Sequence, residues 1–187
     1  MTTFVRIAAL GVGLTALSFA ASINVALGSN GGVASQSSTY PGGDASKAND
    51  GDTNPYWAHG SVSHTGSNLH AWWEVAFNST YQISSIIVYN RLDATSETRI
   101  NPFSVFLYDS TNTPVFTSMG NNFPTIATPS MTFAVNNILA NRLRIQLDGT
   151  NYLHLAEVQA MATPEPATYA LMAGGLTLLG LMRRRKS

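Results

Sequence analysis

Cysteine is absent from this sequence of 187 residues, and charged side chains are scarce, with Asp, Glu, Lys and Arg together at 11%. The lack of cysteine excludes disulfide bonds, thiol catalysis and metal sites built on thiolates. Stability must therefore come from a packed core. Hydrophobic residues make up 44% of the chain, which is enough for one domain of roughly 140 residues.

Basic residues are few in the middle of the chain, although the formal net charge is zero. Of the ten Lys and Arg residues, Arg6 lies near the N-terminus and four lie within residues 183–186, whereas Glu165 is the one acidic residue in an end segment. The middle then has five basic and nine acidic side chains, a charge of about minus four. Such a surface repels phosphate backbones, so we expect no nucleic-acid partner.

Sequence signatures of catalysis are also missing. No Gly-x-Ser-x-Gly turn for a nucleophilic serine occurs. His64, His70 and His154 lack the spacing of zinc ligands, and His59 with His64 is expected to lie on a loop. Spacing alone identifies no carboxylate pair for glycoside cleavage. We therefore expect a protein that is not an enzyme.

The first 22 residues have the order of a secretory signal peptide. Arg6 precedes an apolar run at residues 7–17, and small residues follow at 18–22. Cleavage is expected after Ala20 or Ser22, and the alternative is a buried core helix. An exported protein without disulfides fits a bacterial envelope better than a small eukaryotic secreted domain.

The C-terminal segment, residues 162–187, combines three features. Pro164-Glu165-Pro166 precedes an apolar run at 167–182, and Arg183-Arg184-Arg185-Lys186 follows. The run is slightly shorter than the roughly 20 residues that span a bilayer, and the terminal cations are expected to stay cytoplasmic. The order resembles the PEP-CTERM sorting signal of Gram-negative bacteria. The resemblance implies a membrane helix at 167–182, cleavage by an exosortase-type protease, and transfer from the inner membrane to the cell surface or extracellular matrix. The alternative is a permanent single-pass anchor.

The middle, residues 23–161, is expected to consist of short strands separated by turns. The clearest alternation of apolar and polar residues runs over 143–148, as a half-buried antiparallel strand requires. Further strands are expected at 83–89, 103–108 and 115–116 and from Trp72 onward, with a turn at 109–114. No helical period precedes the C-terminal segment. This pattern predicts an all-β, antiparallel sandwich or jelly roll.

Three motifs in this middle part occur in a known order. Asn24-Val25-Ala26-Leu27-Gly28 is followed by Ala48-Asn49-Asp50-Gly51-Asp52 and then by Trp72-Trp73-Glu74-Val75. Together they resemble the discoidin-like (coagulation-factor type C) superfamily over nearly the whole middle domain. The resemblance implies a discoidin-like antiparallel β-sandwich over residues 23–161.

A narrower pattern is carried by His64, Arg91, Asp93 and Arg99. His64 is followed after twenty-six residues by Arg91, and Asp93 comes two positions later. This spacing resembles the F-type, fucose-binding lectins, in which a second basic residue stands five positions after the Asp. Here Arg99 comes one position late, and Ala94-Thr95 stands where many members carry a cysteine pair that contacts the sugar.

The resemblance implies a carbohydrate site formed by His64, Arg91 and Arg99, with Asp93 supporting a guanidinium. Arginine offers five donors and histidine a donor or an acceptor, which suits the hydroxyl groups of a neutral sugar. Tyr56, Trp57 or Leu92 is expected to face the methyl group of fucose. Alternatively, Arg91 and Asp93 form an ordinary surface pair while His64 caps a turn.

The same resemblance implies calcium as a cofactor. Its expected ligands are the carboxylates of Asp50 and Glu157, Ser61, and the main-chain carbonyls of Lys47, Asp52 and Ala156. Oxygen ligands in this number suit calcium. The loop at 50–55 is alternatively a polar turn, but Glu157 lies in an apolar context where an unpaired carboxylate is costly.

These expectations predict an exported, calcium-supported lectin that binds a glycan or exopolysaccharide at the bacterial surface. The alternative is a structural or adhesive matrix protein with a discoidin-like domain that binds no simple sugar.

Overall fold

The computed structural model describes residues 21–93, 96–125, 127–163 and 174–175, and the described residues up to 163 fold as an all-β domain. The prediction of an antiparallel all-β fold is confirmed. The strands are β1 (Ile23–Asn24), β2 (Val33–Gln36), β3 (Ser63–Leu69), β4 (Trp72–Asn90), β5 (Phe103–Tyr108), β6 (Pro114–Asn121), β7 (Ser130–Leu147) and β8 (Thr150–Ala162). Three short 3-10 helices are η1 (Gly28–Asn30), η2 (Ala45–Ala48) and η3 (Trp57–His59).

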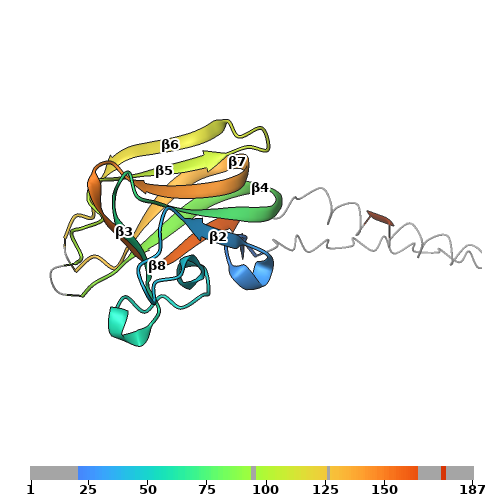
Figure 1. The fold of residues 1–187 in the computed structure, drawn as a ribbon. Coiled ribbons are helices and arrows are strands. Elements are labelled where there is room, and N and C mark those ends of the chain that lie inside the picture. The colour runs from blue at the N-terminus through green and yellow to red at the C-terminus, as the bar shows by residue number, and fades with distance from the viewer. Residues whose placement is uncertain (1–20, 94–95, 126, 164–173, 176–187) are drawn as a thin grey trace, which may run out of the picture.

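All strands pair antiparallel in one sheet, in the order β1-β8-β4-β7-β5-β6, with β2 added to β4 and β3 added to β8 (Figure 1). The longest ladder joins β4 and β7. Two stretches expected as separate strands, from residue 72 and at 83–89, are parts of the single strand β4. Register shifts between Ala76 and Tyr81 interrupt the ladder, and such bulges bend a strand without ending it.

The sheet folds over onto itself to enclose its core. Phe103 of β5 pairs with Leu147 at one end of β7, whereas Phe133 lies 14 residues back along β7. A flat strand would separate the two positions by roughly 46 Å at about 3.3 Å per residue. The ring centroids of Phe103 and Phe133 are nevertheless 6.2 Å apart, so the two ends of the sheet face each other as the layers of a sandwich do.

The alternation seen in the sequence supplies this core. Along β7, Leu143, Ile145 and Leu147 are buried while Arg142 and Arg144 between them are partly exposed, because successive side chains of a strand point to opposite faces. The buried hydrophobic residues form one cluster that includes Trp73, whose indole N–H donates to the Ala45 carbonyl oxygen.

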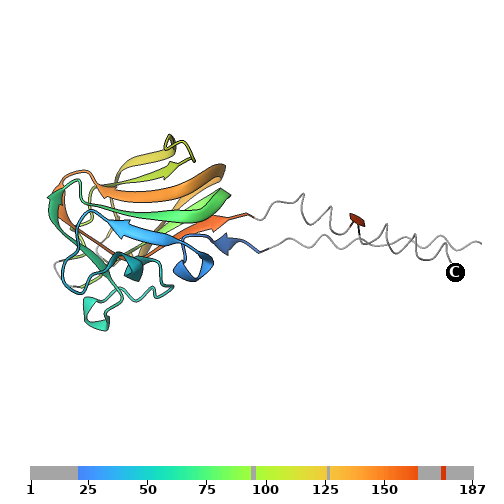
Figure 2. The ribbon, with the colours of Figure 1, turned by 45° about the vertical axis from the view of Figure 1, so that its right-hand side comes forward.

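Both ends of the domain lie at one edge of the sheet. Ile23 of β1 is opposite Ala162 of β8, and the two strand ends lie side by side in Figures 1 and 2. The predicted signal peptide, residues 1–22, and the predicted membrane helix, 167–182, fall almost entirely outside the described residues. Within those residues, no helix has the length and apolar character needed to cross a membrane.

Candidate functional site

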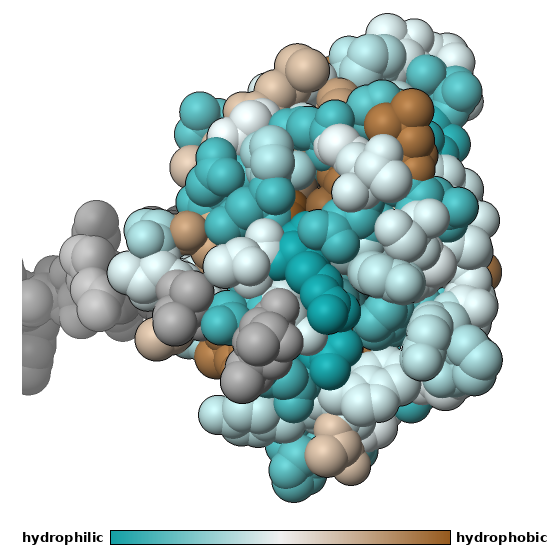
Figure 3. Space-filling model, turned by 60° about the vertical axis from the view of Figure 1, so that its left-hand side comes forward, coloured by the Kyte–Doolittle hydropathy of each residue, from teal (hydrophilic) through white to brown (hydrophobic). Residues whose placement is uncertain are grey.

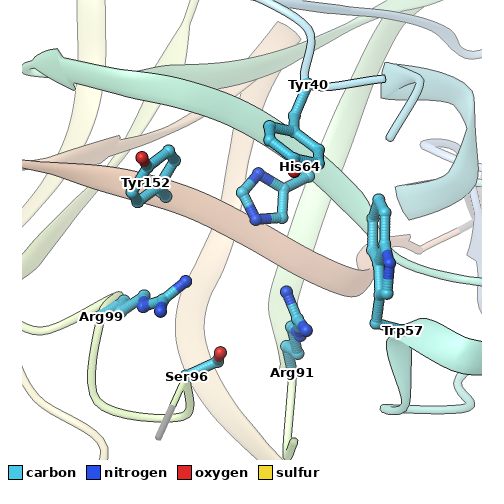
Figure 4. Close-up of a pocket in the computed structure, with 7 residues that line it drawn as sticks. All are labelled: Tyr40, Trp57, His64, Arg91, Ser96, Arg99 and Tyr152. Carbon is cyan, nitrogen blue, oxygen red and sulfur yellow. The ribbon is translucent and has the colours of Figure 1, made fainter. Parts of the chain in front are cut away.

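A hollow of about 310 Å³ opens at the edge of β3 and β8. Side chains from three loops and two strands surround it, and Figure 4 shows both arginines pointing toward the ring of His64. The molecular face that carries β3 is mostly hydrophilic, with only scattered apolar residues (Figure 3). The residues lining the hollow are Tyr40, Trp57, His64, Arg91, Ser96, Arg99 and Tyr152.

His64 lies on β3 and not on a loop, which corrects the expectation from the sequence. Its Nδ1 is 2.7 Å from the carbonyl oxygen of Thr65. Since a carbonyl oxygen only accepts, Nδ1 carries the proton and Nε2 is left as an acceptor when the ring is neutral. Burial lowers the pKa of His64, and the positive charges of Arg91 and Arg99 lower it further against the opposing effect of the Thr65 carbonyl. The imidazole is therefore held neutral.

Asp93 connects the two sides of the hollow. Its Oδ2 accepts hydrogen bonds from Arg91 Nε at 2.5 Å and from the main-chain N–H of Trp57 at 2.8 Å. Burial alone would raise the pKa of Asp93, but these two donors hold it below its ordinary value. Because Asp93 takes the Nε–H, the terminal amino groups of Arg91 remain available to the hollow (Figure 4). Asp93 is thus in contact with both Arg91 and Trp57.

Arg99 reaches the hollow despite its late position in the sequence. Before it, the Ser96 N–H donates to the Asp93 carbonyl and the Arg99 N–H donates to the Ser96 carbonyl, and these contacts keep Arg99 near Asp93. The guanidinium carbon of Arg99 lies 5.5 Å from the ring centroid of Tyr152. Among the described residues Arg99 has no carboxylate partner, so its donors are directed at whatever fills the hollow.

Aromatic rings form the walls. Tyr40 lies over His64 with ring centroids 4.8 Å apart, and Trp57 lies 5.4 Å from His64 and 5.3 Å from the Arg91 guanidinium carbon. Of the three expected candidates for an apolar wall, Trp57 lines the hollow and Tyr56 and Leu92 do not. Tyr40, Ser96 and Tyr152 were not anticipated.

A glycine at position 43 allows the loop that carries Tyr40 to pack closely against His64. The main-chain N–H of Tyr40 donates to the His64 carbonyl, and His64 N–H donates to the Gly43 carbonyl. A Cβ on Gly43 would lie 2.5 Å from the Cβ of His64, so only glycine permits this close pairing. In the sequence, the pair Gly42-Gly43 shortly after Tyr40 is the signal that could have indicated such a contact.

The chemistry of the hollow is specific in its hydrogen bonding. Arg91 and Arg99 are donors only, His64 Nε2 is an acceptor, and the aromatic walls offer apolar faces. A matching ligand presents several oxygen acceptors, at least one hydroxyl donor, and an apolar surface between them. A saccharide ring has this combination.

Of the residues expected to bind calcium, Asp50 and Asp52 lie in the loop between η2 and η3, and this loop contacts Glu157 of β8. Glu157 of β8 is fully buried, and its Oε2 accepts a hydrogen bond from Gly51 N–H at 3.3 Å. Its Oε1 is buried without a partner. Burial and the nearby Asp50 and Asp52 charges raise the pKa of Glu157 to about 7, against hydrogen bonds from the main chain of Gly51 and Asp50.

The other expected calcium ligands make hydrogen bonds within their own loop or lie on neighbouring elements. Asp50 Oδ1 and Asp52 Oδ1 accept main-chain hydrogen bonds within the loop, and the hydroxyl of Ser61 donates to the Asn54 carbonyl. Lys47 lies on η2, one residue before its end, and Ala156 is buried on β8 beside Glu157. In the part of the chain that the structure describes, no three His, Asp or Glu side chains are grouped as a metal site.

Two family models match this chain. The F5/F8 type C model described as the NedA-like, galactose-binding domain matches residues 47–145. The model of the PEP-CTERM protein-sorting motif matches residues 162–186.

Two curated relatives are fucolectins of Anguilla japonica. Fucolectin-6 is 32% identical over 121 residues, which cover 63% of this chain and 63% of the relative, so the chain spans less than two thirds of that protein. Fucolectin-5 is 31% identical over 142 residues, which cover 70% of this chain and 73% of the relative.

Solved structures show the same fold. The Streptococcus pneumoniae fucose binding module SpX-3 is 30% identical, with a TM-score of 0.69 over 76% of this chain and 99% of the module. The lectin domain of lectinolysin, solved with Lewis B antigen, is 29% identical, with a TM-score of 0.70 over 76% of this chain and 98% of that domain. The family 32 module of NanJ from C. perfringens, solved with galactose, shares the fold at 20% identity and a TM-score of 0.56.

Proposed function

The chain belongs to the F5/F8 type C family of NedA-like, galactose-binding domains, and from that premise we propose that it is an exported lectin that captures a terminal saccharide in the hollow. The observation that carries this function is the convergence of three side chains on one cavity: His64 from β3, and Arg91 and Arg99 from the loop between β4 and β5. L-Fucose is the first candidate ligand, because the fucolectins and the fucose binding module are similar to this chain.

The arrangement favours binding without turnover. Glycoside cleavage by the usual route needs two carboxyl groups on either side of the scissile bond, and the residues that line the hollow include no carboxylate. The carboxylate of Asp93, beside the hollow, accepts hydrogen bonds from Arg91 and from the main chain of Trp57. A single site of this size is expected to bind with millimolar to micromolar affinity, about −4 to −8 kcal/mol, so adhesion would need many copies on one surface.

Calcium is proposed as a structural cofactor beside Glu157. Glu157 has a buried carboxylate oxygen without a hydrogen-bond donor, and two further acidic residues lie near it. A bound cation would compensate for the cost of burying this oxygen. Asp50, Glu157 and Ser61, with the carbonyls of Lys47, Asp52 and Ala156, are the residues that would hold the ion. Bound there, calcium would offset two of the three negative charges of Asp50, Asp52 and Glu157 and would hold the loop at 50–55 against β8.

Export to the surface of a Gram-negative bacterium is the third part of the proposal. The PEP-CTERM motif at residues 162–186 supports processing by an exosortase-type protease after passage to the inner membrane. A glycan or exopolysaccharide outside the cell would then be the ligand.

A glycan array tests the proposed function directly. Full-length protein in mild detergent is applied with calcium and with chelator, beside His64→Ala as the matched variant. Binding to fucosylated glycans that is lost in His64→Ala supports the proposal. Flat signals for all sugars, or equal binding by both proteins, would leave the structural matrix protein as the better interpretation.

A further inference from the structure

The hollow and the chain ends lie at opposite ends of β8. Tyr152 and His154 lie at the hollow end of this strand, where His154 is opposite His64. Ala162 lies at the other end, opposite Ile23. Eight residues separate His154 from Ala162, and at about 3.3 Å per residue the strand carries the chain roughly 26 Å away from the hollow.

The neighbouring strand β4 independently shows that the hollow and the end of β8 lie far apart. Arg91, which follows β4, lines the hollow. Nine residues earlier, the carbonyl oxygen of Gln82 accepts a hydrogen bond from Thr163 N–H, directly after β8. Two antiparallel ladders therefore hold the end of the domain away from the site, and the strand ends lie opposite β3 in Figure 1.

The sorting motif begins where β8 ends. It matches residues 162–186, and only residues 163–166 separate Ala162 from the apolar run at 167–182. Four residues span at most about 14 Å when extended, which is shorter than the distance between the hollow and the end of β8. A domain held by this segment cannot turn its hollow onto the membrane that carries it without lifting its own attachment point.

On the basis of the proposed lectin function, we propose that the protein binds in trans. Its hollow faces away from the surface that holds the C-terminal segment, and the partner is a fucosylated polymer or a second surface, not a glycolipid of the carrier membrane. Cleavage near the Pro-Glu-Pro sequence would preserve this polarity, because any attachment at the new end would still lie at the Ala162 end of the sheet.

Single-cysteine variants test the polarity, since the chain has no cysteine of its own. Leu139 is 53% exposed and is opposite Gln82, near the end of the domain. Ala58 is exposed on η3, beside Trp57 at the hollow. Full-length Leu139→Cys and Ala58→Cys, in mild detergent, are coupled through the thiol to maleimide beads at equal density. The detergent is then washed away, and each set of beads is offered vesicles that carry a fucosyl lipid.

We expect Leu139→Cys beads to capture the vesicles and Ala58→Cys beads to lose capture, because coupling at position 58 turns the hollow toward the bead. In parallel, the binding of free L-fucose is measured for both variants before they are coupled to the beads. If both bind fucose but capture vesicles equally, or only Ala58→Cys beads capture them, the trans geometry is wrong while the lectin function stands. If neither binds any fucosyl ligand, both proposals are overturned.

Discussion

His64 and His154 lie directly opposite each other on β3 and β8, with ring centroids 5.3 Å apart. The first faces the hollow, and the second is fully buried with both ring nitrogens unpartnered. Burial, followed by the charges of His64, Arg91 and Arg99, lowers the pKa of His154 to about 3. Next to His64, the buried side chain of His154 is thus a neutral imidazole with desolvated ring nitrogens.

Replacing His154 by leucine is expected to stabilise the protein. An apolar side chain removes two desolvated polar groups, which cost about 1–3 kcal/mol when unsatisfied, so His154→Leu should raise the free energy of unfolding by about 1 kcal/mol. Urea denaturation of the full chain measures the change, with Leu155→Ala as a control that should destabilise. A loss of more than 1 kcal/mol in His154→Leu would mean that the imidazole has a partner.

Sugar affinity is expected to fall in acid. Protonation of His64 removes the Nε2 acceptor and adds a positive charge beside two arginines, and the lowered pKa of His64 places this loss below pH 6.5. Titration calorimetry with L-fucose between pH 8 and pH 4.5 should show constant affinity at first and a decline in the acidic range. The same decline in His154→Leu would assign it to His64, and a pH-independent affinity would contradict the neutral-acceptor assignment.

The same two histidines make the fold sensitive to acid. Their pKa values are lowered in the folded state, so the unfolded chain binds more protons below pH 6.5 and stability falls with decreasing pH. His154 alone should contribute a loss of about 1.4 kcal/mol per pH unit from about pH 6 to about pH 3. Thermal unfolding of the wild type and of His154→Leu across this range isolates the contribution, because the variant lacks it.

Glu157→Gln separates a cation site from a buried acid. The pKa of Glu157 is raised to about 7 from 4.5, so the folded state binds the extra proton and stability is lost as the pH rises through that window. In chelator at pH 8, Glu157→Gln should unfold at a higher temperature than the wild type, and calcium should stabilise the wild type but not the variant. Equal effects of calcium on both proteins would refute the site.

Asp93→Asn tests the support of Arg91. The amide keeps the shape of the side chain but weakens the charge-assisted bond to Arg91 Nε, and fucose affinity should fall about tenfold, or about 1.4 kcal/mol. Glu74→Gln is the matched control, because Glu74 pairs with Arg142 and Arg144 away from the hollow. If Asp93→Asn and the wild type bound fucose equally well, the position of Arg91 would depend on its packing against Trp57 and not on Asp93.

Gly43→Ala should disturb the hollow through the backbone. The added Cβ would lie 2.5 Å from the Cβ of His64 and 2.8 Å from its nitrogen, so the loop that carries Tyr40 must move. We expect a destabilisation of about 1–3 kcal/mol together with weaker fucose binding. Gly149→Ala, where an added Cβ meets nothing within 4 Å, should leave both measurements unchanged.

Some features of this molecule could be predicted from the sequence because they depend on the order of residues that are close together in the chain. The alternation at 143–148 reappears as the buried Leu143, Ile145 and Leu147 of β7, since the period of two is a property of any strand. The motif of His64, Arg91 and Asp93 and the sorting signal were likewise readable from spacing. Local pattern missed that β4 is one strand through residues 78–80, because β4 pairs with β7 on both sides of the irregularity between Ala76 and Tyr81.

Tertiary structure alone decided what meets in space. That Arg99 enters the hollow in spite of an added residue depends on how the loop after Asp93 winds. That Tyr40 and Tyr152 wall the site, and that the site lies far from the chain end, depends on which strands pair and in which register. The physical reason is that periodicity specifies the face on which a side chain lies, whereas contacts between distant segments arise only when the sheet folds over and buries its apolar faces together.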